Sequence, residues 1–246
     1  MDKLMGMETS SRILVLIPCY MEAGYIGEIV AEVKKMNFPV VVVDDGSADN
    51  TAQEAKAGGA AVIRHEANKG KGAAIITGIA YAVENDYDLI ITLDGDKQHN
   101  PNEIDRFVKK YNEEKPHLII GSRMNNTKDM PIIRRIINRL MSSLISKIAG
   151  QKISDTQSGY RLISKDAMPV VMECCSSGFS AESEIILNLA YRGFNICEVP
   201  ISTIYTNGKS KIRPVRDTLK FIQMLSHFFR TRRREDKGKE YNNAIP

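Results

Sequence analysis

The sequence predicts an α/β fold in which helices cover both sides of a doubly wound, mostly parallel sheet. Continuous apolar runs such as 13–17 and 89–93 fit strands that are buried on both faces. Segments with helical spacing of apolar residues alternate with these runs. Short polar motifs follow several runs, at the edge where such sheets bind ligands. The chain has 246 residues, of which 43% are hydrophobic, enough for one large domain with a modest appendage.

The first half alternates regularly between strand and helix. The expected strands share an apolar composition rich in Val, Ile and Leu: 13–17, 40–43, 61–63, 89–93 and 118–120. The expected helices share helical spacing or an Ala-rich composition, or begin at a proline that suits a first turn: 26–33, 52–57, 72–84 and the segment from Pro101. The order is βαβαβαβαβ, which is typical of a doubly wound sheet.

The second half is less regular and ends in a basic helix. Helices are expected at 134–149 and 182–191, and extended segments at 160–163, 196–199 and 201–205. From Pro214 a last helix carries one apolar stripe, at Val215, Leu219, Ile222, Leu225 and Phe229. The predicted organisation is a tail at 1–11, the main α/β domain at 12–208, a basic loop and amphipathic helix at 209–234, and a disordered tail at 235–246.

Charge and cysteine content limit the partners and the compartment. The net charge is +4, but residues 209–239 hold 11 Lys or Arg and 3 acids, so that segment carries +8 and the rest −4. Such local basicity favours an anionic membrane surface over nucleic acid. The four cysteines lack a CxxC spacing, no signal peptide is apparent and no apolar run is long enough to cross a bilayer. We therefore expect a reduced, cytoplasmic protein.

Two acidic motifs follow expected strands and carry the strongest functional signal. In the second motif, Asp94, Asp96 and Gln98 alternate along an extended segment, so their oxygens can face one cation. Oxygen ligands of this kind suit Mg²⁺ or Mn²⁺, which proteins commonly hold against a substrate diphosphate. The motif therefore predicts an enzyme that uses a nucleotide sugar. In the first motif, Asp44 and Asp45 precede a Gly-Ser turn. They either bind the nucleotide or cap the next helix.

Other loops at strand ends complete the candidate site. Tyr20 and Glu22 follow the first strand, where they border a nucleotide or form an ordinary turn. The segment Asn68-Lys69-Gly70-Lys71-Gly72 lacks the Walker spacing, which argues against an ATPase, and Lys69 is the expected nucleotide contact. Arg123 follows another strand and Arg134 begins a helix, so both can bind a phosphate. Asp155 lies in a loop before a strand and is either a base or an orienting group.

Taken in order, these loops resemble a known family. IPCYMEAG, VVVDDGSADNT, NKGKGAA, TLDGDKQHNP, GSR, DTQSGYRLI, ESEIILNLAYRG and GKSKI are similar to motifs of the family 2 inverting glycosyltransferases with the GT-A fold. Within that family they look like the polyprenyl-phosphate sugar transferases, such as dolichol-phosphate mannosyltransferase. Cys19 and Met21 replace the commoner Ala and Asn, and Asn138 stands where a Ser often helps to bind the lipid phosphate.

The resemblance assigns roles by position. The nucleotide contacts are Pro18, Tyr20, Glu22, Asp45 and Asp94. Asp96 and Gln98 match metal ligands, and Arg123 and Arg134 match contacts to the acceptor phosphate. Lys209, Ser210 and Lys211 match a loop that closes over the donor phosphates.

The reaction implied is transfer of a hexose from a UDP- or GDP-sugar to a polyprenyl phosphate, with inversion, at the cytoplasmic face of a membrane. Such an acceptor is already ionised, so a general base is not required. A sugar hydroxyl as acceptor is the first alternative and makes Asp155 essential as a base. A nucleotide-binding protein without activity is the second. A homo-oligomer or a membrane partner is compatible with all three.

Overall fold

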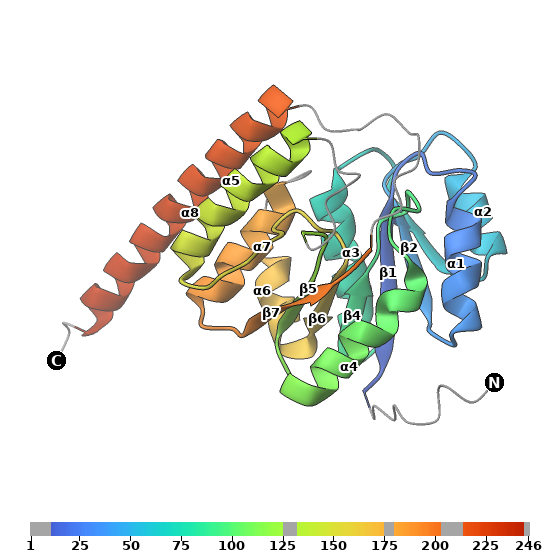
Figure 1. Ribbon diagram of the computed structural model, residues 1–246, viewed down its shortest axis with the longest axis horizontal. Coiled ribbons are helices and arrows are strands. Elements are labelled where there is room, and N and C mark those ends of the chain that lie inside the picture. Colours follow the sequence, from blue (N-terminus) through green and yellow to red (C-terminus); the bar gives the residue numbers. More distant parts are fainter. Residues whose placement is uncertain (1–10, 125–131, 175–179, 203–213, 244–246) are drawn as a thin grey trace.

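A seven-stranded sheet forms the centre of the computed structural model (Figure 1), which describes residues 11–124, 132–174, 180–202 and 214–243. The strand order is β3-β2-β1-β4-β6-β5-β7. The strands are β1 (Ile13–Cys19), β2 (Val40–Asp44), β3 (Ala61–Arg64), β4 (Leu89–Thr92), β5 (Leu118–Ser122), β6 (Arg161–Ser164) and β7 (Ile196–Pro200). Only β6 runs antiparallel to its neighbours in this sheet of described strands, so the predicted mostly parallel α/β domain is confirmed.

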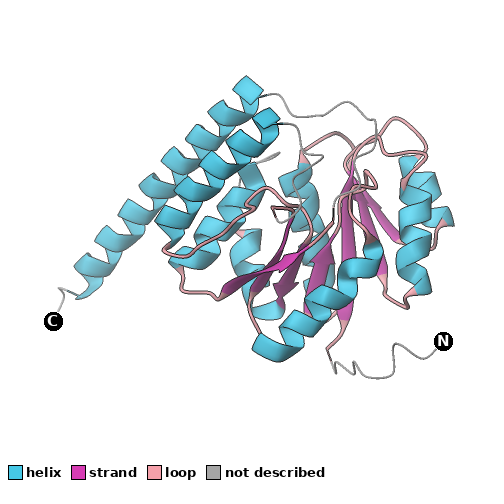
Figure 2. Ribbon diagram, in the orientation of Figure 1, coloured by secondary structure: helices cyan, strands magenta, loops and turns pink. Residues whose placement is uncertain are grey.

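Helices cover both faces of the sheet (Figure 2). They are α1 (Ile26–Lys35), α2 (Thr51–Ala57), α3 (Lys71–Glu84), α4 (Ile104–Glu114), α5 (Ile132–Ala149), α6 (Met168–Met172), α7 (Ser180–Tyr191) and α8 (Pro214–Asn243), with single 3-10 turns at Pro101–Glu103 and Lys165–Ala167. Alternate residues of β1 point to opposite faces. Leu14 and Leu16 pack with α3 and α7, whereas Val15 and Ile17 pack with α1 and α4.

The antiparallel strand β6 explains why a late loop reaches the ligand edge. Arg161, its first residue, pairs with Thr92 near the end of β4 and with Ile120 of β5. Because β6 runs in the opposite direction, the segment that precedes it arrives at the edge where the parallel strands end. Residues 155–160 therefore lie beside the loops that follow β4 and β5.

The last helix is longer than predicted. It continues to Asn243, so the disordered tail predicted from residue 235 is wrong over that stretch. The residues that extend the helix, 235–243, include two Lys and two Glu, which are good helix formers. The stripe expected from the sequence lies mostly outside the core: Leu219, Ile222 and Phe229 are exposed and Leu225 is partly buried, whereas Phe221, Met224 and Phe228 pack on the domain. None of the helices, within the residues described, is long and apolar enough to cross a membrane.

Candidate active site

The site lies where the strand order reverses, between β1 and β4. From β1 the chain moves outward through β2 to β3, and it then returns to β4 on the other side of β1. The crevice outside the carboxyl ends of such strands is the usual ligand site of open α/β sheets. The loops after β1, β2, β4 and β5 end here, as does the loop before β6.

The loop after β1 is held by side chains of the loop after β2. The backbone N–H of Met21 donates to Ser47 Oγ at 2.9 Å, and that of Glu22 donates to Thr51 Oγ1 at 2.9 Å. Tyr20 is 45% exposed beside this anchored turn, whereas Pro18 is buried within β1. Tyr20 and Glu22 are thus placed at the mouth of the crevice, where the sequence predicts a nucleotide.

Asp44 and Asp45 are both buried; Asp44 binds its own loop and Asp45 binds the loop after β3. Asp44 Oδ1 accepts from the backbone N–H of Ser47 at 3.0 Å. Asp45 Oδ1 lies 2.7 Å from His65 Nδ1 and accepts from the Lys69 N–H at 2.9 Å, while its Oδ2 accepts from the Gly70 N–H at 2.7 Å. Their nucleotide role stays a prediction. In this structure the two carboxylates shape the turn and tie down the glycine-rich loop.

Lys71 joins two carboxylates at the centre of the crevice. Its Nζ lies 2.6 Å from Asp94 Oδ1 and 2.7 Å from Glu182 Oε1. Burial opposes both charges, but the ion pair prevails: the pKa of Asp94 lies well below its ordinary value, and the pKa of Lys71 lies above its own. Lys69, the predicted contact, has an exposed side chain instead. The loop therefore directs Lys71 toward the site.

A glycine of the loop before β6 touches this ion pair. A Cβ on Gly159 would lie 2.4 Å from Asp94 Oδ1 and 2.7 Å from Lys71 Nζ. The Gly159 carbonyl accepts a hydrogen bond from Thr92 Oγ1 at 2.6 Å, which fixes the approach. Any larger residue would displace the pair, so glycine is required here for space.

The predicted metal ligands follow Asp94 on a tight turn. Asp96 and Gln98 are both partly exposed, and Asp96 Oδ1 accepts from the Gln98 backbone N–H at 3.1 Å. The donor set of carboxylate and amide oxygens fits a hard divalent cation. No group of three or more His, Cys, Asp or Glu is arranged for metal binding in the described parts of the chain. The predicted set of two carboxylates and one amide would leave the other coordination positions to phosphate and water, as is usual for Mg²⁺.

His99 supports this turn from within. It is 3% exposed, its Nδ1 accepts from the Asp94 backbone N–H at 3.2 Å, and its ring lies 5.1 Å from that of Tyr160. Burial lowers the pKa of His99, which favours the neutral ring at pH 7. It acts as a structural support for Asp94.

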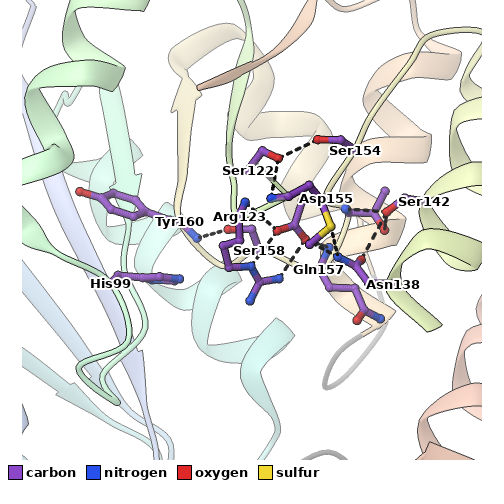
Figure 3. Close-up of polar contacts among 12 residues, drawn as sticks. His99, Ser122, Arg123, Asn138, Ser142, Ser154, Asp155, Gln157, Ser158 and Tyr160 are labelled. Atoms are coloured by element: carbon purple, nitrogen blue, oxygen red, sulfur yellow. Dashed lines mark hydrogen bonds and ion pairs between the residues drawn. The ribbon is translucent and has the colours of Figure 1, made fainter. Parts of the chain in front are cut away.

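Arg123 and Asp155 form a buried, bidentate ion pair on the other side of the crevice (Figure 3). Arg123 Nε and its Nη2 donate to the two Asp155 oxygens at 2.7 and 2.9 Å. Asn138 Nδ2 of α5 donates to Asp155 Oδ1 at 3.1 Å. Asp155 is 0% exposed, and although burial alone would raise its pKa, the Arg123 guanidinium holds that pKa below its ordinary value. This geometry favours the orienting role over the base.

Two further charged side chains, Glu198 and Arg161, hold the loop that carries Asp155. Glu198 of β7 accepts from the backbone N–H of Ser154 at 2.9 Å and from that of Asp155 at 3.2 Å. The guanidinium of Arg161 donates to three backbone carbonyls, those of Thr156, Ser158 and Glu182. The loop is thus tied to β7 and to the first turn of α7, and Asp155 has little freedom to move.

A family comparison agrees with the order of these loops. Residues 14–170, more than half of the chain, match the model of glycosyl transferase family 2. The chain belongs to glycosyl transferase family 2. The resemblance predicted from its motifs is therefore confirmed.

Two relatives and one solved structure are similar to this family 2 glycosyltransferase. It is 38% identical to an uncharacterized protein of Methanocaldococcus jannaschii, over 79% of this chain and 82% of that protein. It is 33% identical to the UDP-N-acetylglucosamine–dolichyl-phosphate N-acetylglucosaminyltransferase of Methanococcus voltae, over 79% and 86%. A glucosyl-3-phosphoglycerate synthase of Mycobacterium tuberculosis, crystallised with Mn²⁺, UDP and phosphoglyceric acid, has the same GT-A fold, with a TM-score of 0.69 and 18% identity over 88% of this chain and 78% of that one.

Some predicted residues of the glycosyltransferase lie beyond the described structure. Lys209, Ser210 and Lys211 fall outside the described residues. Arg134 belongs to α5, but its side chain is likewise not among those described. Their contacts to phosphate stay predictions.

Sequence reasoning missed three charged groups of the site. Lys71 stands two residues after Lys69, and the alternation Lys-Gly-Lys was the available signal for it. Glu182 lies in the first turn of a helix, where an acid is favourable without any chemistry, yet it is 1% exposed and paired with Lys71. Arg161 had no local signal, because its partners are carbonyls that only the folded loop brings together.

Proposed function

We propose that this enzyme transfers a sugar from a nucleoside diphosphate sugar to the phosphate of a polyprenyl phosphate, with inversion. The observation that carries the proposal is the state of Asp155, which is fully buried, accepts two hydrogen bonds from Arg123 and has a lowered pKa. Such a carboxylate is a poor base toward an acceptor. The acceptor that suits this site is therefore one that is already ionised.

A phosphate monoester meets that requirement, since its second pKa is about 6. Its oxygen attacks the anomeric carbon from the face opposite the donor diphosphate, the bond from that carbon to the diphosphate oxygen breaks, and the nucleoside diphosphate leaves. Arg123 is the described cation closest to Asp155 and would orient the acceptor phosphate. Arg134 is the proposed second contact. The name of the Methanococcus voltae relative supports a lipid phosphate acceptor.

The donor side uses the motif after β4. Asp96 and Asp94 would hold Mg²⁺ or Mn²⁺ with help from Gln98, and such a cation, when bound, neutralises charge on the leaving diphosphate. Lys71 adds a fixed positive charge 2.6 Å from Asp94. Tyr20 and Glu22 would border the nucleotide, and Lys209 to Lys211 would cover the donor phosphates. With a lipid acceptor, the enzyme would work at the cytoplasmic face of a membrane.

A transfer assay with purified protein tests this function. UDP-N-acetylglucosamine, UDP-glucose and GDP-mannose are each supplied with Mn²⁺ and dolichyl phosphate in detergent, and the lipid product is identified by mass spectrometry. We expect one of the donors to yield a sugar-phosphate lipid. No product should form when free dolichol replaces dolichyl phosphate, or when EDTA is added. Transfer to sugar hydroxyls without any transfer to dolichyl phosphate would favour the base-dependent alternative and reject the proposal.

A further inference from the structure

Helix α5 carries polar site residues on one side and an exposed apolar stripe on the opposite side. Asn138 and Ser142 are 1% and 3% exposed and face the loop of Asp155. Ile136, Leu140 and Leu144 follow one another at intervals of four residues and are 52%, 66% and 42% exposed. With 3.6 residues per turn, Leu140 lies on the side of the helix opposite Asn138. Burial in the core does not explain this stripe.

Helix α8 presents a second exposed stripe beside α5 (Figure 1). Leu219, Ile222 and Phe229 are 56%, 56% and 53% exposed. Of the twelve large apolar side chains that are exposed among the described residues, these two helices hold six. Ile148 at the end of α5 and Phe229 of α8 also line one hollow of about 950 Å³, so the helices are neighbours there.

Basic residues dominate α5 and the middle of α8, whereas the acids of α8, Asp217, Glu235, Asp236 and Glu240, lie nearer its ends. The sequence of α5 contains three arginines, one lysine and no acidic residue. From Leu219 to Arg233, α8 has four basic residues and again no acid. Arg230 and Arg233 also line the hollow, beside its apolar wall. Exposed apolar stripes with basic flanks are typical of helices that lie in a membrane interface.

We propose that the outer faces of α5 and α8 together form the surface that docks on an anionic lipid bilayer. We call this surface the docking face; its apolar members are Ile136, Leu140, Leu144, Leu219, Ile222 and Phe229. Anionic headgroups pair with its arginines and lysines while the apolar side chains enter the interface. This inference rests on the proposed function, because a lipid acceptor requires contact with its membrane.

A second copy of the chain is a poorer occupant of the docking face. A two-fold interface places the same patch of both subunits together. Arg139 and Arg233 would then face other cations, with no acid on either helix segment to pair with them. A bilayer that contains anionic lipids supplies the missing negative charge.

The docking face has a consequence for the reaction. On the inner side of α5, Asn138 donates to Asp155, and Asp155 in turn holds Arg123. The outer side of the same helix belongs to the docking face. The helix that meets the membrane thus also positions the acceptor-phosphate site. A lipid phosphate at the bilayer surface would lie within reach of that site.

Vesicle flotation of the full-length protein tests the docking face. The vesicles contain phosphatidylcholine alone or phosphatidylcholine with phosphatidylglycerol at 7:3. We expect the protein to float with the anionic vesicles, binding at least tenfold more strongly than to neutral ones. The double variant Leu140→Gln/Leu144→Gln should bind about tenfold more weakly. Val83→Gln is the matched control, because Val83 is 45% exposed on α3, and it should bind as the wild type does.

Two further measurements separate this inference from the proposed function. Circular dichroism checks that each variant is folded, and transfer is compared between water-soluble geranyl phosphate and dolichyl phosphate in vesicles. The docking face predicts that Leu140→Gln/Leu144→Gln loses transfer only in vesicles. Vesicle binding that depends on Leu140 without any transfer would support the docking face and reject the function. Equal binding by the folded double variant would overturn the docking face, as would a wild-type dimer that this variant dissociates.

Discussion

Asp155 shows how the surroundings of a residue decide its chemistry. An aspartate in a loop before a strand is compatible with a base or with an orienting group. In the fold it accepts a bidentate pair of bonds from Arg123 and another from Asn138, and no part of it is exposed. A base must reach the proton that it removes, so this aspartate serves best as the support that holds Arg123 in place.

We expect Asp155→Asn to lower kcat/KM for the lipid phosphate by roughly 100-fold, because Arg123 loses its fixed orientation. Donor binding, measured by calorimetry with a UDP- or GDP-sugar, should change little. The remaining activity should still fall at low pH, the acidic limb of its pH profile, because the acceptor phosphate takes up a proton near its second pKa of about 6. A profile that loses this limb while the protein stays folded would show that Asp155 is a base.

The pH dependence of stability follows from the same ion pair. The folded pKa of Asp155 is depressed, so its stabilising contribution is present above the unfolded value of about 3.9 and is lost as pH falls through the folded value. The difference in unfolding free energy between wild type and Asp155→Asn should therefore be constant from about pH 5 to 8 and shrink only below about pH 4.

Lys71 offers a second prediction at this scale. Lys71→Met should reduce the free energy of unfolding by about 3 kcal/mol, because the buried Glu182 carboxylate is left unpaired. Urea denaturation at pH 7 measures the loss, and Lys69→Met is the control, since its side chain is exposed and its removal should change stability by less than about 0.5 kcal/mol. Adding Glu182→Gln to Lys71→Met should restore part of the loss. Equal stability of the two lysine variants would contradict the assigned ion pair.

At the scale of elements, α8 shows that the sequence of a helix does not reveal which of its apolar side chains will pack on the domain. The stripe expected from the sequence is mostly exposed, at Leu219, Ile222 and Phe229. The fold instead buries a neighbouring stripe, in which Phe221, Met224 and Phe228 are no more than 6% exposed. Phe228 packs edge-on against Tyr191 of α7, at 6.2 Å between ring centroids.

Paired alanine variants test which face of α8 packs. Phe228→Ala should cost about 3–5 kcal/mol of unfolding free energy, because a large buried side chain is lost. Phe229→Ala, one residue later and 53% exposed, should cost less than about 0.5 kcal/mol. Both values come from urea denaturation without lipid. If the two losses were equal, or Phe229 the more costly, the assigned packing of α8 would be wrong.

For the whole molecule, one antiparallel strand decides what the crevice contains. Because β6 lies between β4 and β5, Gly159 reaches Asp94, and Asp155 reaches Arg123. A fully parallel sheet would place the loop before this strand at the opposite edge, far from both. The same short loop thus contacts both Asp94 and Arg123, on the two sides of the crevice.

The sequence by itself determined the alternation of strands and helices, the order of the ligand loops and, through those loops, the family. These features are local, because a run of Val and Ile or an Asp-Gly-Asp motif can be recognised from a few neighbouring residues. The tertiary structure decided which groups the charges meet: Asp45 the glycine-rich loop, Lys71 the carboxylates of Asp94 and Glu182, and Asp155 the guanidinium of Arg123. The physical reason is that burial and ion pairing depend on residues up to about a hundred positions apart, which only the packed sheet brings into contact.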